Sequence, residues 1–333
     1  MIRPLVTARA ALVALLTAIL IAAGCGSTKS TATSATSAAG NPSAFPMTIA
    51  VDGTTLTFNS PPKVLVDQYE ATWPVAAAGG NTTGKVVAVT DDANQPLGDA
   101  AATLDGVPRI STYAIVSKEV IIGAKPNLVI THGLSTGQAE QLDAVGIKTM
   151  VVNVCWDDYA SHHGGHVGFD AIYDDITTIG RVLGTSDYAA KSVASLKQTV
   201  ATVSEQAKTL PKQTVSITAG LFSGSFFTYG ASSIANTQIT TLGLTNTFAD
   251  VAKRGFSASP EEFINRNPDF VVLGYDPVTG NADKTMQQAM AVPGFSTMHA
   301  VQNHHLLVMS DTFLLGRAVD GLKMVYDAIA AAK

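Results

Sequence analysis

The sequence has only two cysteines, Cys25 and Cys155, in a chain of 333 residues. Two cysteines cannot build a disulfide framework, so stability has to come from a hydrophobic core. Charged residues make up only 14% of the chain, the net charge is -5, and no basic run occurs after the N-terminus. Because phosphate binding requires a concentrated positive surface, we do not expect a nucleic acid partner.

Motifs of catalysis are missing, incomplete or too short to be specific. The chain has no His-Glu-x-x-His pair, and the Gly-x-Ser-x-Gly spacing of residues 133–137 is a weak signal on its own. Residues 79–85 have the Gly-x4-Gly-Lys spacing of a phosphate loop, but Val86 stands where that loop requires serine or threonine. A strand is expected after this segment, whereas a phosphate loop leads into a helix. We therefore predict that the protein is not an enzyme.

Residues 1–24 are typical of a signal peptide. Two arginines precede the apolar stretch Ala10–Ala23, which is too short to span a bilayer comfortably. Small residues stand directly before Cys25, and this arrangement resembles a bacterial lipoprotein signal. The resemblance implies lipidation of Cys25 and an exported protein anchored to the outer face of the cytoplasmic membrane. A plain secretory peptide with an incidental cysteine is the alternative.

Residues 25–46 are rich in Ser, Thr, Ala and Gly and show no apolar periodicity, which predicts a flexible tether. The body then opens with two β-prone runs on either side of Asp52-Gly53, a strong hairpin signal. Short apolar runs alternate with helical patterns after it, which predicts parallel sheets of βαβ units. The expected strands are 64–67, 86–89, 128–131, 149–154, 214–219, 270–273 and 305–309, and the expected flanking helices are 70–78, 117–124, 137–145, 232–242, 260–265, 284–291 and 317–332.

Two consecutive amphipathic helices are predicted in the middle of the chain, at 169–183 and 187–210, the second with its apolar residues from Val193 to Leu210. Apolar residues recur in both at steps of three and four, which places them on one helical face. Gly184 is expected to end the first helix, and Ser186 or Asp187 to cap the second. A helix about 35 Å long between two α/β halves is suited to act as a rigid strut.

The two halves contain a repeated segment. Residues 117–130 align without gaps with residues 259–272. Each copy has a serine, a glutamate two residues later, an apolar pair, and a Pro-Asn or Pro-Asp turn that leads into a β-run. Two copies of one unit in a chain imply two lobes that are built alike.

These segments resemble the substrate-binding lipoproteins of ABC importers for ferric siderophores, haem and cobalamin. The resemblance also rests on Pro62-Lys63-Val-Leu-Val, Gly79-Gly80, Lys125-Pro126-Asn-Leu-Val-Ile, 141–149 and 179–184. It implies a class III periplasmic-binding-protein fold, in which two Rossmann-like α/β lobes with mostly parallel sheets are joined by a single long α-helix and hold the ligand in the cleft between them. The expected division is a lobe at 47–186, a joining helix at 187–210 and a second lobe at 211–333.

Family members dock onto arginines of the permease through one glutamate on each lobe. The repeat carries this role to Glu119 and Glu261. The alternative is purely structural, because both glutamates stand in the first turn of a helix, where negative charge suits the helix dipole. Ser259, Pro260 and Glu262 form a capping box, so Glu262 is expected to be structural.

Ligand contacts are expected from loops at strand ends that face between the lobes. Aromatic walls with one or two arginines suit a large flat or anionic chelate. Arg254 and Arg317 are equally well explained as surface or ion-pair residues. The predicted contacts are Tyr69, Trp73, Tyr113, His132, Trp156, Asp158, Tyr159, His162, His163, Phe227, Tyr229, Arg254, Phe313 and Arg317.

A loop rich in histidine and aspartate, residues 157–166, leads into the first central helix. His162, His163 and His166 are of the type that ligates zinc or iron, but adjacent histidines rarely reach one ion. We expect this loop to be a polar part of the cleft, with direct metal ligation as the alternative.

The sequence thus predicts a monomeric solute-binding lipoprotein that delivers a ferric siderophore to an ABC permease and its ATPase. Haem or cobalamin is the alternative within the same class. A protein for bare zinc or manganese is a more distant alternative, since it needs three or four ligands from both lobes. No intrinsic cofactor is expected.

Overall fold

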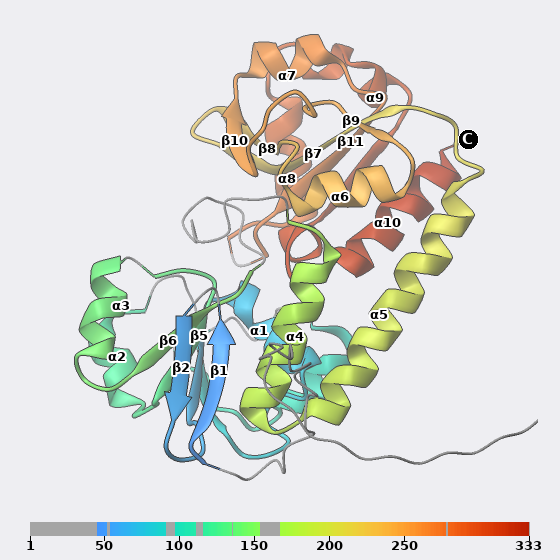
Figure 1. Cartoon of the computed structure of the whole chain (residues 1–333). Helices are drawn as coiled ribbons and strands as arrows, with labels where there is room; N and C mark the ends of the chain where they lie inside the picture. Colours follow the sequence, from blue (N-terminus) through green and yellow to red (C-terminus); the bar gives the residue numbers. More distant parts are fainter. Residues whose placement is uncertain are drawn as a thin grey trace, which may run out of the picture. The chain divides into compact units, whose positions relative to one another are not determined.

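The computed structural model describes residues 45–51, 54–90, 97–110, 116–134, 136–153, 167–277 and 279–332 (Figure 1). The body begins with an antiparallel hairpin of β1 (Met47–Val51) and β2 (Thr54–Phe58). Both strands lie where the alternating pattern predicted them.

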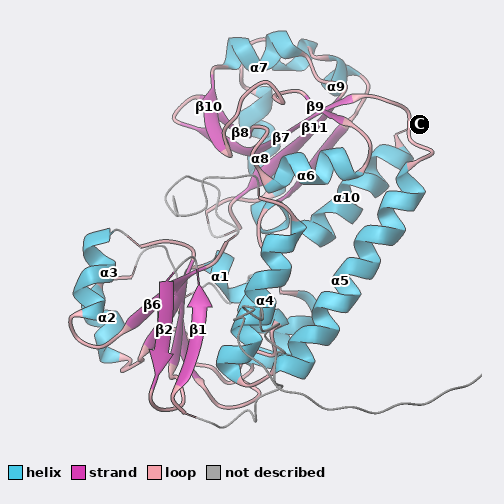
Figure 2. Cartoon of the chain, in the orientation of Figure 1, coloured by secondary structure: helices cyan, strands magenta, loops and turns pink. Residues whose placement is uncertain are grey.

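The first lobe contains a four-stranded parallel sheet in the order β4-β3-β5-β6. Its strands are the short apolar runs of the sequence, and β3 and β5 are buried along their whole length. Figure 2 shows helices beside this sheet. The elements are β3 (Val64–Asp67), α1 (Tyr69–Ala77), β4 (Val86–Val89), the 3-10 helix η1 (Gly98–Leu104), α2 (Lys118–Gly123), β5 (Leu128–Thr131), α3 (Thr136–Asp143), β6 (Lys148–Val151) and α4 (Phe169–Leu183).

The second lobe has a mixed sheet in the order β10-β8-β7-β11-β12, with the short β9 paired to β7. The β7, β11 and β12 strands are parallel, whereas β8 pairs antiparallel with β7, and β10 pairs antiparallel with β8 at the edge of the sheet; the sequence pattern predicted neither β8 nor β10. The elements are β7 (Thr214–Phe222), β8 (Ser225–Tyr229), α6 (Ile234–Thr241), β9 (Thr245–Asn246), β10 (Gly255–Ala258), α7 (Pro260–Arg266), β11 (Phe270–Tyr275), α8 (Ala282–Met290), η3 (Phe295–Thr297), α9 (His299–Gln302), β12 (Leu306–Ser310), η4 (Asp311–Leu314) and α10 (Ala318–Ala331).

The repeated segment has the same structure in both lobes. Its helices, α2 and α7, are each followed by a non-glycine residue with positive φ at the equivalent position of the repeat, Lys125 at 53° and Asn267 at 43°. The Asn or Asp that follows the proline then accepts a hydrogen bond from the backbone N–H just before or at the start of the neighbouring strand: Asn127 from Lys63, and Asp269 from Thr214. The sequence repeat is therefore a repeat of turn geometry.

The long helix α5 (Ser186–Ala207) packs against α4 of the first lobe and α10 of the second. Figure 1 shows it running beside both. A single apolar cluster includes Ile179 of α4, Val203 of α5 and Val325 of α10. The helix thus joins the lobes through packed side chains, as the strut hypothesis predicted. Among the described residues, no helix is both long and apolar enough to cross a bilayer.

The turn between α4 and α5 differs from its prediction in one respect. Gly184 ends α4 in the left-handed conformation with φ of 70°, as expected. The N-cap of α5, however, is Thr185 and not Ser186 or Asp187, and it makes no side-chain cap bond. Its hydroxyl instead donates to the Ala78 carbonyl at 2.5 Å, because this turn lies against the end of α1.

The segment with phosphate-loop spacing has a structural role. The Lys85 ammonium donates to the carbonyls of Leu183 and Val182 at the C-terminal end of α4, at 2.9 and 3.4 Å. Cations favour that end of a helix because its last carbonyls lack intrahelical partners. Gly80 has φ of 48°, and a Cβ there would lie 2.5 Å from the Thr103 carbonyl oxygen. The glycine and lysine spacing is thus explained by packing.

Candidate ligand site where the lobes meet

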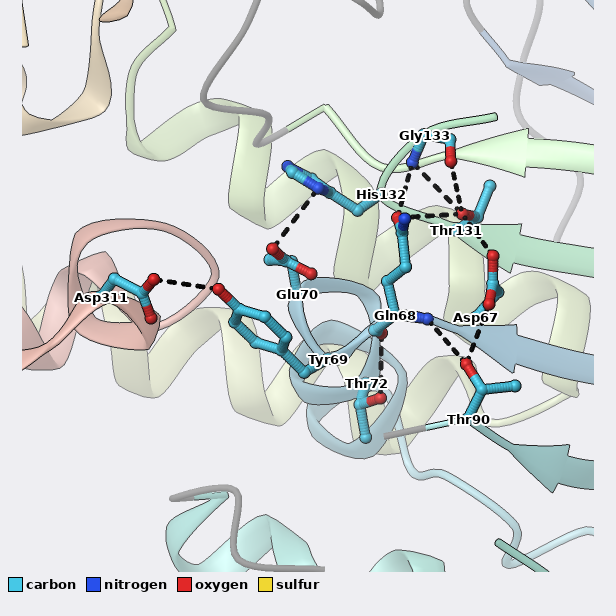
Figure 3. Close-up of polar contacts among 10 residues, drawn as sticks. All are labelled: Asp67, Gln68, Tyr69, Glu70, Thr72, Thr90, Thr131, His132, Gly133 and Asp311. Carbon is cyan, nitrogen blue, oxygen red and sulfur yellow. Dashed lines mark hydrogen bonds and ion pairs between the residues drawn. The ribbon is translucent and has the colours of Figure 1, made fainter. Parts of the chain in front are cut away.

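Three neighbouring strands of the first lobe end in a buried polar network (Figure 3). Asp67, the last residue of β3, is fully buried and accepts hydrogen bonds from the hydroxyls of Thr90 at 2.9 Å and Thr131 at 3.3 Å. Thr90 and Thr131 lie at the ends of β4 and β5. Because the carboxyl ends of parallel strands share one edge of the sheet, the network fixes the place where α1 begins.

The residue that follows has an unusual backbone conformation. Gln68 has φ of 70° and ψ of 147°, a region that side chains rarely adopt and that costs about 1–3 kcal/mol. Its backbone N–H donates to Thr90 Oγ1 at 3.0 Å, and its side-chain Oε1 accepts from the Gly133 N–H at 3.1 Å. These bonds hold the strained turn and set the direction of the next two side chains, Tyr69 and Glu70.

Tyr69 connects the two lobes. Its hydroxyl donates to Asp311 Oδ2 at 2.9 Å, and Asp311 opens η4 after the last strand of the second lobe (Figure 3). The backbone at Gly316 also lies against the Glu70 carbonyl and the Trp73 ring. The start of α1 and the turn around η4 are therefore in direct contact.

Glu70 lies beside this contact and is 8% exposed, while Asp311 is 6% exposed. The Nδ1 atom of His132, the residue after β5, lies 3.5 Å from Glu70 Oε1. Burial, strengthened by the nearby charges of Asp276 and Asp67, raises the pKa of Glu70 to about 7. Burial and the Glu70 charge also raise the pKa of Asp311 well above its usual range. The junction thus holds acidic groups from both lobes.

Replacing Glu70 with glutamine should change how stability depends on pH. A carboxyl whose folded pKa is about 7 and whose unfolded pKa is 4.5 binds more protons when folded, so its stabilisation is complete below pH 4.5 and is lost as the pH rises through 7. Glu70→Gln should therefore stabilise the chain more at pH 8 than at pH 4.5, by about 3 kcal/mol at most. Urea denaturation of both proteins at the two pH values measures this difference; an equal effect at both pH values contradicts the buried, raised pKa.

Aromatic side chains of β7 and β8 form a row along the β7–β8 hairpin: Phe222 at the end of β7, and Phe227 and Tyr229 on β8. The Phe227 ring contacts those of Phe222 at 6.3 Å and Tyr229 at 6.0 Å, both edge to face. Exposure decreases along this row, from 51% at Phe222 through the half-buried Phe227 to 3% at Tyr229. Phe227 and Tyr229 were predicted contacts, and the more exposed Phe222 was not among them.

The other predicted residues in the described ranges have mainly structural contacts. Trp73 is buried in the core at 6% exposure, and Arg254 is buried at 4%. Arg317 pairs with Asp320 at 2.6 Å, and its guanidinium lies 4.8 Å from the centre of the Phe313 ring. The ion-pair explanation that the sequence left open for Arg317 therefore accounts for its position. Whether any of these residues contacts a ligand stays a prediction.

The remaining predicted site residues lie outside the described residues: Cys25, Tyr113, Trp156, Asp158, Tyr159, His162, His163 and His166. Within the ranges the structure describes, no group of three or more His, Cys, Asp or Glu side chains is arranged to hold a metal ion.

The acidic residues at the junction were not among the ligand contacts predicted from the sequence: Glu70, Asp276 and Asp311. A signal for them exists, because Asp67, Asp276 and Asp311 each end or directly follow a parallel strand that leads to the same kind of edge. Tyr69 and His132 were predicted, and the structure brings both next to this group.

A separate groove of about 770 Å³ runs along α4 and α5. It is lined by Phe169, Tyr173, Lys197 and other residues of these helices, and the Lys197 ammonium lies 5.1 Å from the Tyr173 ring centre. None of the predicted ligand contacts that the structure describes lines this groove. We therefore place the candidate site at the polar junction and not here.

The family of this chain follows from its similarity to known proteins. The family model of the periplasmic binding proteins matches residues 70–312, which is most of the chain. The chain belongs to the periplasmic binding protein family. Its fold, with parallel sheets in two lobes and a long joining helix, is that of class III binding proteins, as predicted.

Relatives of this periplasmic binding protein cover nearly all of the described body. An uncharacterized ABC transporter substrate-binding lipoprotein, YvrC of Bacillus subtilis (strain 168), is 26% identical over 302 residues, 88% of this chain and 87% of the relative. A crystal structure of an ABC-type Fe3+-hydroxamate transport system from Saccharomonospora viridis DSM 43017 is 30% identical, with a TM-score of 0.72, and the match covers 86% of this chain and 99% of that one.

A periplasmic haem-binding protein, RhuT from Roseiflexus sp. RS-1, has a TM-score of 0.63 but only 18% identity, over 81% of this chain and 98% of its own, and so shares the fold alone. This periplasmic binding protein is accordingly an ABC transporter substrate-binding protein of the siderophore, haem and cobalamin class. The family consists of solute-binding proteins and is not an enzyme class, and it implies an ABC permease as partner.

Proposed function

We propose that this chain captures a ferric siderophore between its lobes and delivers it to an ABC permease. The observation that carries the proposal is its 30% identity, over 99% of the related chain, to the Fe3+-hydroxamate transport system of Saccharomonospora viridis. A hydroxamate-type chelate is therefore the favoured ligand. The haem-binding relative supports only a shared fold, because its identity is 18%.

The polar junction supports a chelate over a bare metal ion. Its acidic groups come from α1 and η4, but the described residues contain no set of three metal ligands. A preassembled ferric chelate brings its own oxygen ligands to the iron, so the protein needs to bind only the outside of the complex. The aromatic row of β7 and β8 and the acidic junction are suited to this role.

Delivery is proposed to use Glu119 and Glu261. Both are exposed and stand in the first turns of α2 and α7, the equivalent helices of the two repeated units. Two like charges at equivalent positions match a permease with two-fold symmetry. Lipidation of Cys25 is proposed to hold the protein near that permease, as the lipoprotein name of the Bacillus subtilis relative suggests.

Uptake by cells tests this proposal. A strain that lacks this chain should lose import of a 55Fe-labelled ferric trihydroxamate, and the full-length chain should restore it. Import of 55Fe citrate serves as the matched control and should not change. Normal trihydroxamate import without the chain, together with loss of haem or cobalamin import, would transfer the proposal to the alternative ligand.

A further inference from the structure

We propose that Glu70 and Asp311, one from each lobe, form a subsite for a positively charged group on the ligand, such as a primary ammonium of a hydroxamate chelate. This inference rests on the proposed function and specifies the class of substrate. It assigns to these two carboxylates the choice between cationic and uncharged forms of otherwise identical chelates.

Glu70 and Asp311 lie where the two lobes meet. Asp311 is bonded to Tyr69 across the contact between the lobes, and Glu70 is the next residue along α1. Figure 3 shows the Glu70 carboxylate between the His132 ring and the Tyr69–Asp311 pair. A ligand group that enters where the lobes meet therefore encounters carboxylates from both sides. Such a group would hold the lobes together through its own hydrogen bonds.

One carboxylate oxygen of Asp311 is a buried acceptor without a hydrogen-bond donor in the part of the chain that the structure describes. Asp311 is 94% buried, since its exposure is 6%, yet its Oδ1 atom accepts no hydrogen bond from the described residues. The other oxygen, Oδ2, accepts from the Tyr69 hydroxyl. A buried carboxylate oxygen without a donor is costly to maintain, and a donor supplied by a ligand removes that cost.

The charges around Glu70 and Asp311 favour a cationic group over an anionic one. Tyr69, Glu70, Asp311 and Asp276 influence one another electrostatically, and each of these four groups is neutral or negative, while a basic side chain, His132, lies 3.5 Å from Glu70. Arg317, the arginine next to η4, pairs with Asp320. An anionic chelate would face these carboxylates directly, whereas a cation would be attracted by both lobes.

The geometry favours an ammonium over a metal ion. An ammonium has three N–H donors, and Glu70, Asp311 and the Tyr69 oxygen offer three acceptors for them. A metal ion needs a set of three or more ligands, and no such set occurs in the ranges that the structure describes.

Binding of a cation here should also release protons. The groups around the subsite are Tyr69 and Glu70 on α1, Asp67 at the end of β3, His132 after β5, Asp276 after β11 and Asp311 on η4. Burial raises the pKa of Glu70 to about 7, so this carboxyl is partly protonated near pH 7 without ligand, and burial also raises the pKa of Asp311. A neighbouring cation lowers those pKa values and drives the protons off. Affinity for a cationic chelate should therefore increase between pH 6 and pH 8.

A pair of chelates that differ in one charge provides the test. Ferrioxamine B is a linear ferric trihydroxamate with a free ammonium, and its N-acetyl derivative lacks that charge. Isothermal titration of the mature chain at pH 7.5 should show about tenfold tighter binding of ferrioxamine B. Repeating it in two buffers of different ionisation enthalpy should show proton release for ferrioxamine B only.

The double variant Glu70→Gln/Asp311→Asn should bind both chelates with similar affinity, close to that of the wild-type chain for the acetylated form. The matched control, Glu140→Gln/Asp105→Asn, removes two exposed carboxylates of the first lobe and should keep the preference. Circular dichroism confirms that each variant is folded, and the wild-type comparison stands without them.

Two negative results have different meanings. If the wild-type chain binds neither ferric hydroxamate, the proposed function is wrong and this inference falls with it. If it binds both equally and without proton release, or if the folded double variant keeps the preference, the charge subsite is refuted while the proposed function stands.

Discussion

Exchanging Glu119 and Glu261 for lysine in one chain should reduce import of the iron chelate by about tenfold or more, because like charges placed against permease arginines repel them. Ligand affinity should stay unchanged, since both side chains are exposed on α2 and α7 and neither residue belongs to the polar junction. Import of the labelled chelate into cells and titration of the purified variant measure the two effects separately.

The alternative is that these glutamates only stabilise their helices. Asp187 and Asp283 are matched controls, because they too are exposed acids in the first turn of a helix, α5 and α8 respectively. The Asp187→Lys/Asp283→Lys variant changes the charge and the helix dipole interaction in the same way, worth less than about 1 kcal/mol per site. If this control loses import to the same extent, or if the glutamate variant imports normally, the docking role is wrong.

Replacing Gly321 with alanine should destabilise the second lobe and weaken ligand binding together. A Cβ at this position of α10 would lie 2.0 Å from the Phe313 carbonyl oxygen and 2.6 Å from Gln238 Nε2. Gln238 itself donates to the carbonyls of Phe313 and Ala318, and so fastens η4 to α6 and α10. The methyl group must push η4, and with it Asp311, away from α10.

We expect a loss of about 2–4 kcal/mol in the free energy of unfolding for Gly321→Ala, since a backbone atom has to move. Gly123→Ala is the control: it also lies in a helix, but its Cβ would meet no atom within 4 Å, so it should be neutral or slightly stabilising. Urea denaturation and ligand titration test both variants. A Gly321→Ala chain as stable as the wild type would show that η4 is not held as tightly as its contacts indicate.

Much of the fold could be predicted from local patterns. The period of apolar residues located α4, whose observed limits agree with the expected ones, and the turn residues located the repeated unit of α2 and α7. These signals are strong because neighbouring residues carry them. The cap of α5 was missed because Thr185 bonds to Ala78, 107 positions away in sequence, which no local pattern records.

The candidate site could be predicted only in part for the same reason. Tyr69 and His132 stand at strand ends, where ligand contacts were expected. Asp311 lies 242 positions after Tyr69, and only the packing of η4 onto α1 brings the two together. The antiparallel strands β8 and β10 were also missed, because their mixed polar and aromatic residues do not form an apolar run.

Equilibrium titration against a panel of chelates measures whether this periplasmic binding protein binds a ferric hydroxamate. The panel contains ferric hydroxamate, catecholate and carboxylate siderophores, haem, cobalamin and free zinc, each followed by tryptophan fluorescence of the mature chain. We expect one ferric hydroxamate per chain, with a dissociation constant of about 1 μM or lower, and weaker binding of the others. If no ferric hydroxamate binds below tens of micromolar while haem, cobalamin or zinc does, a ferric hydroxamate is not the ligand of this protein.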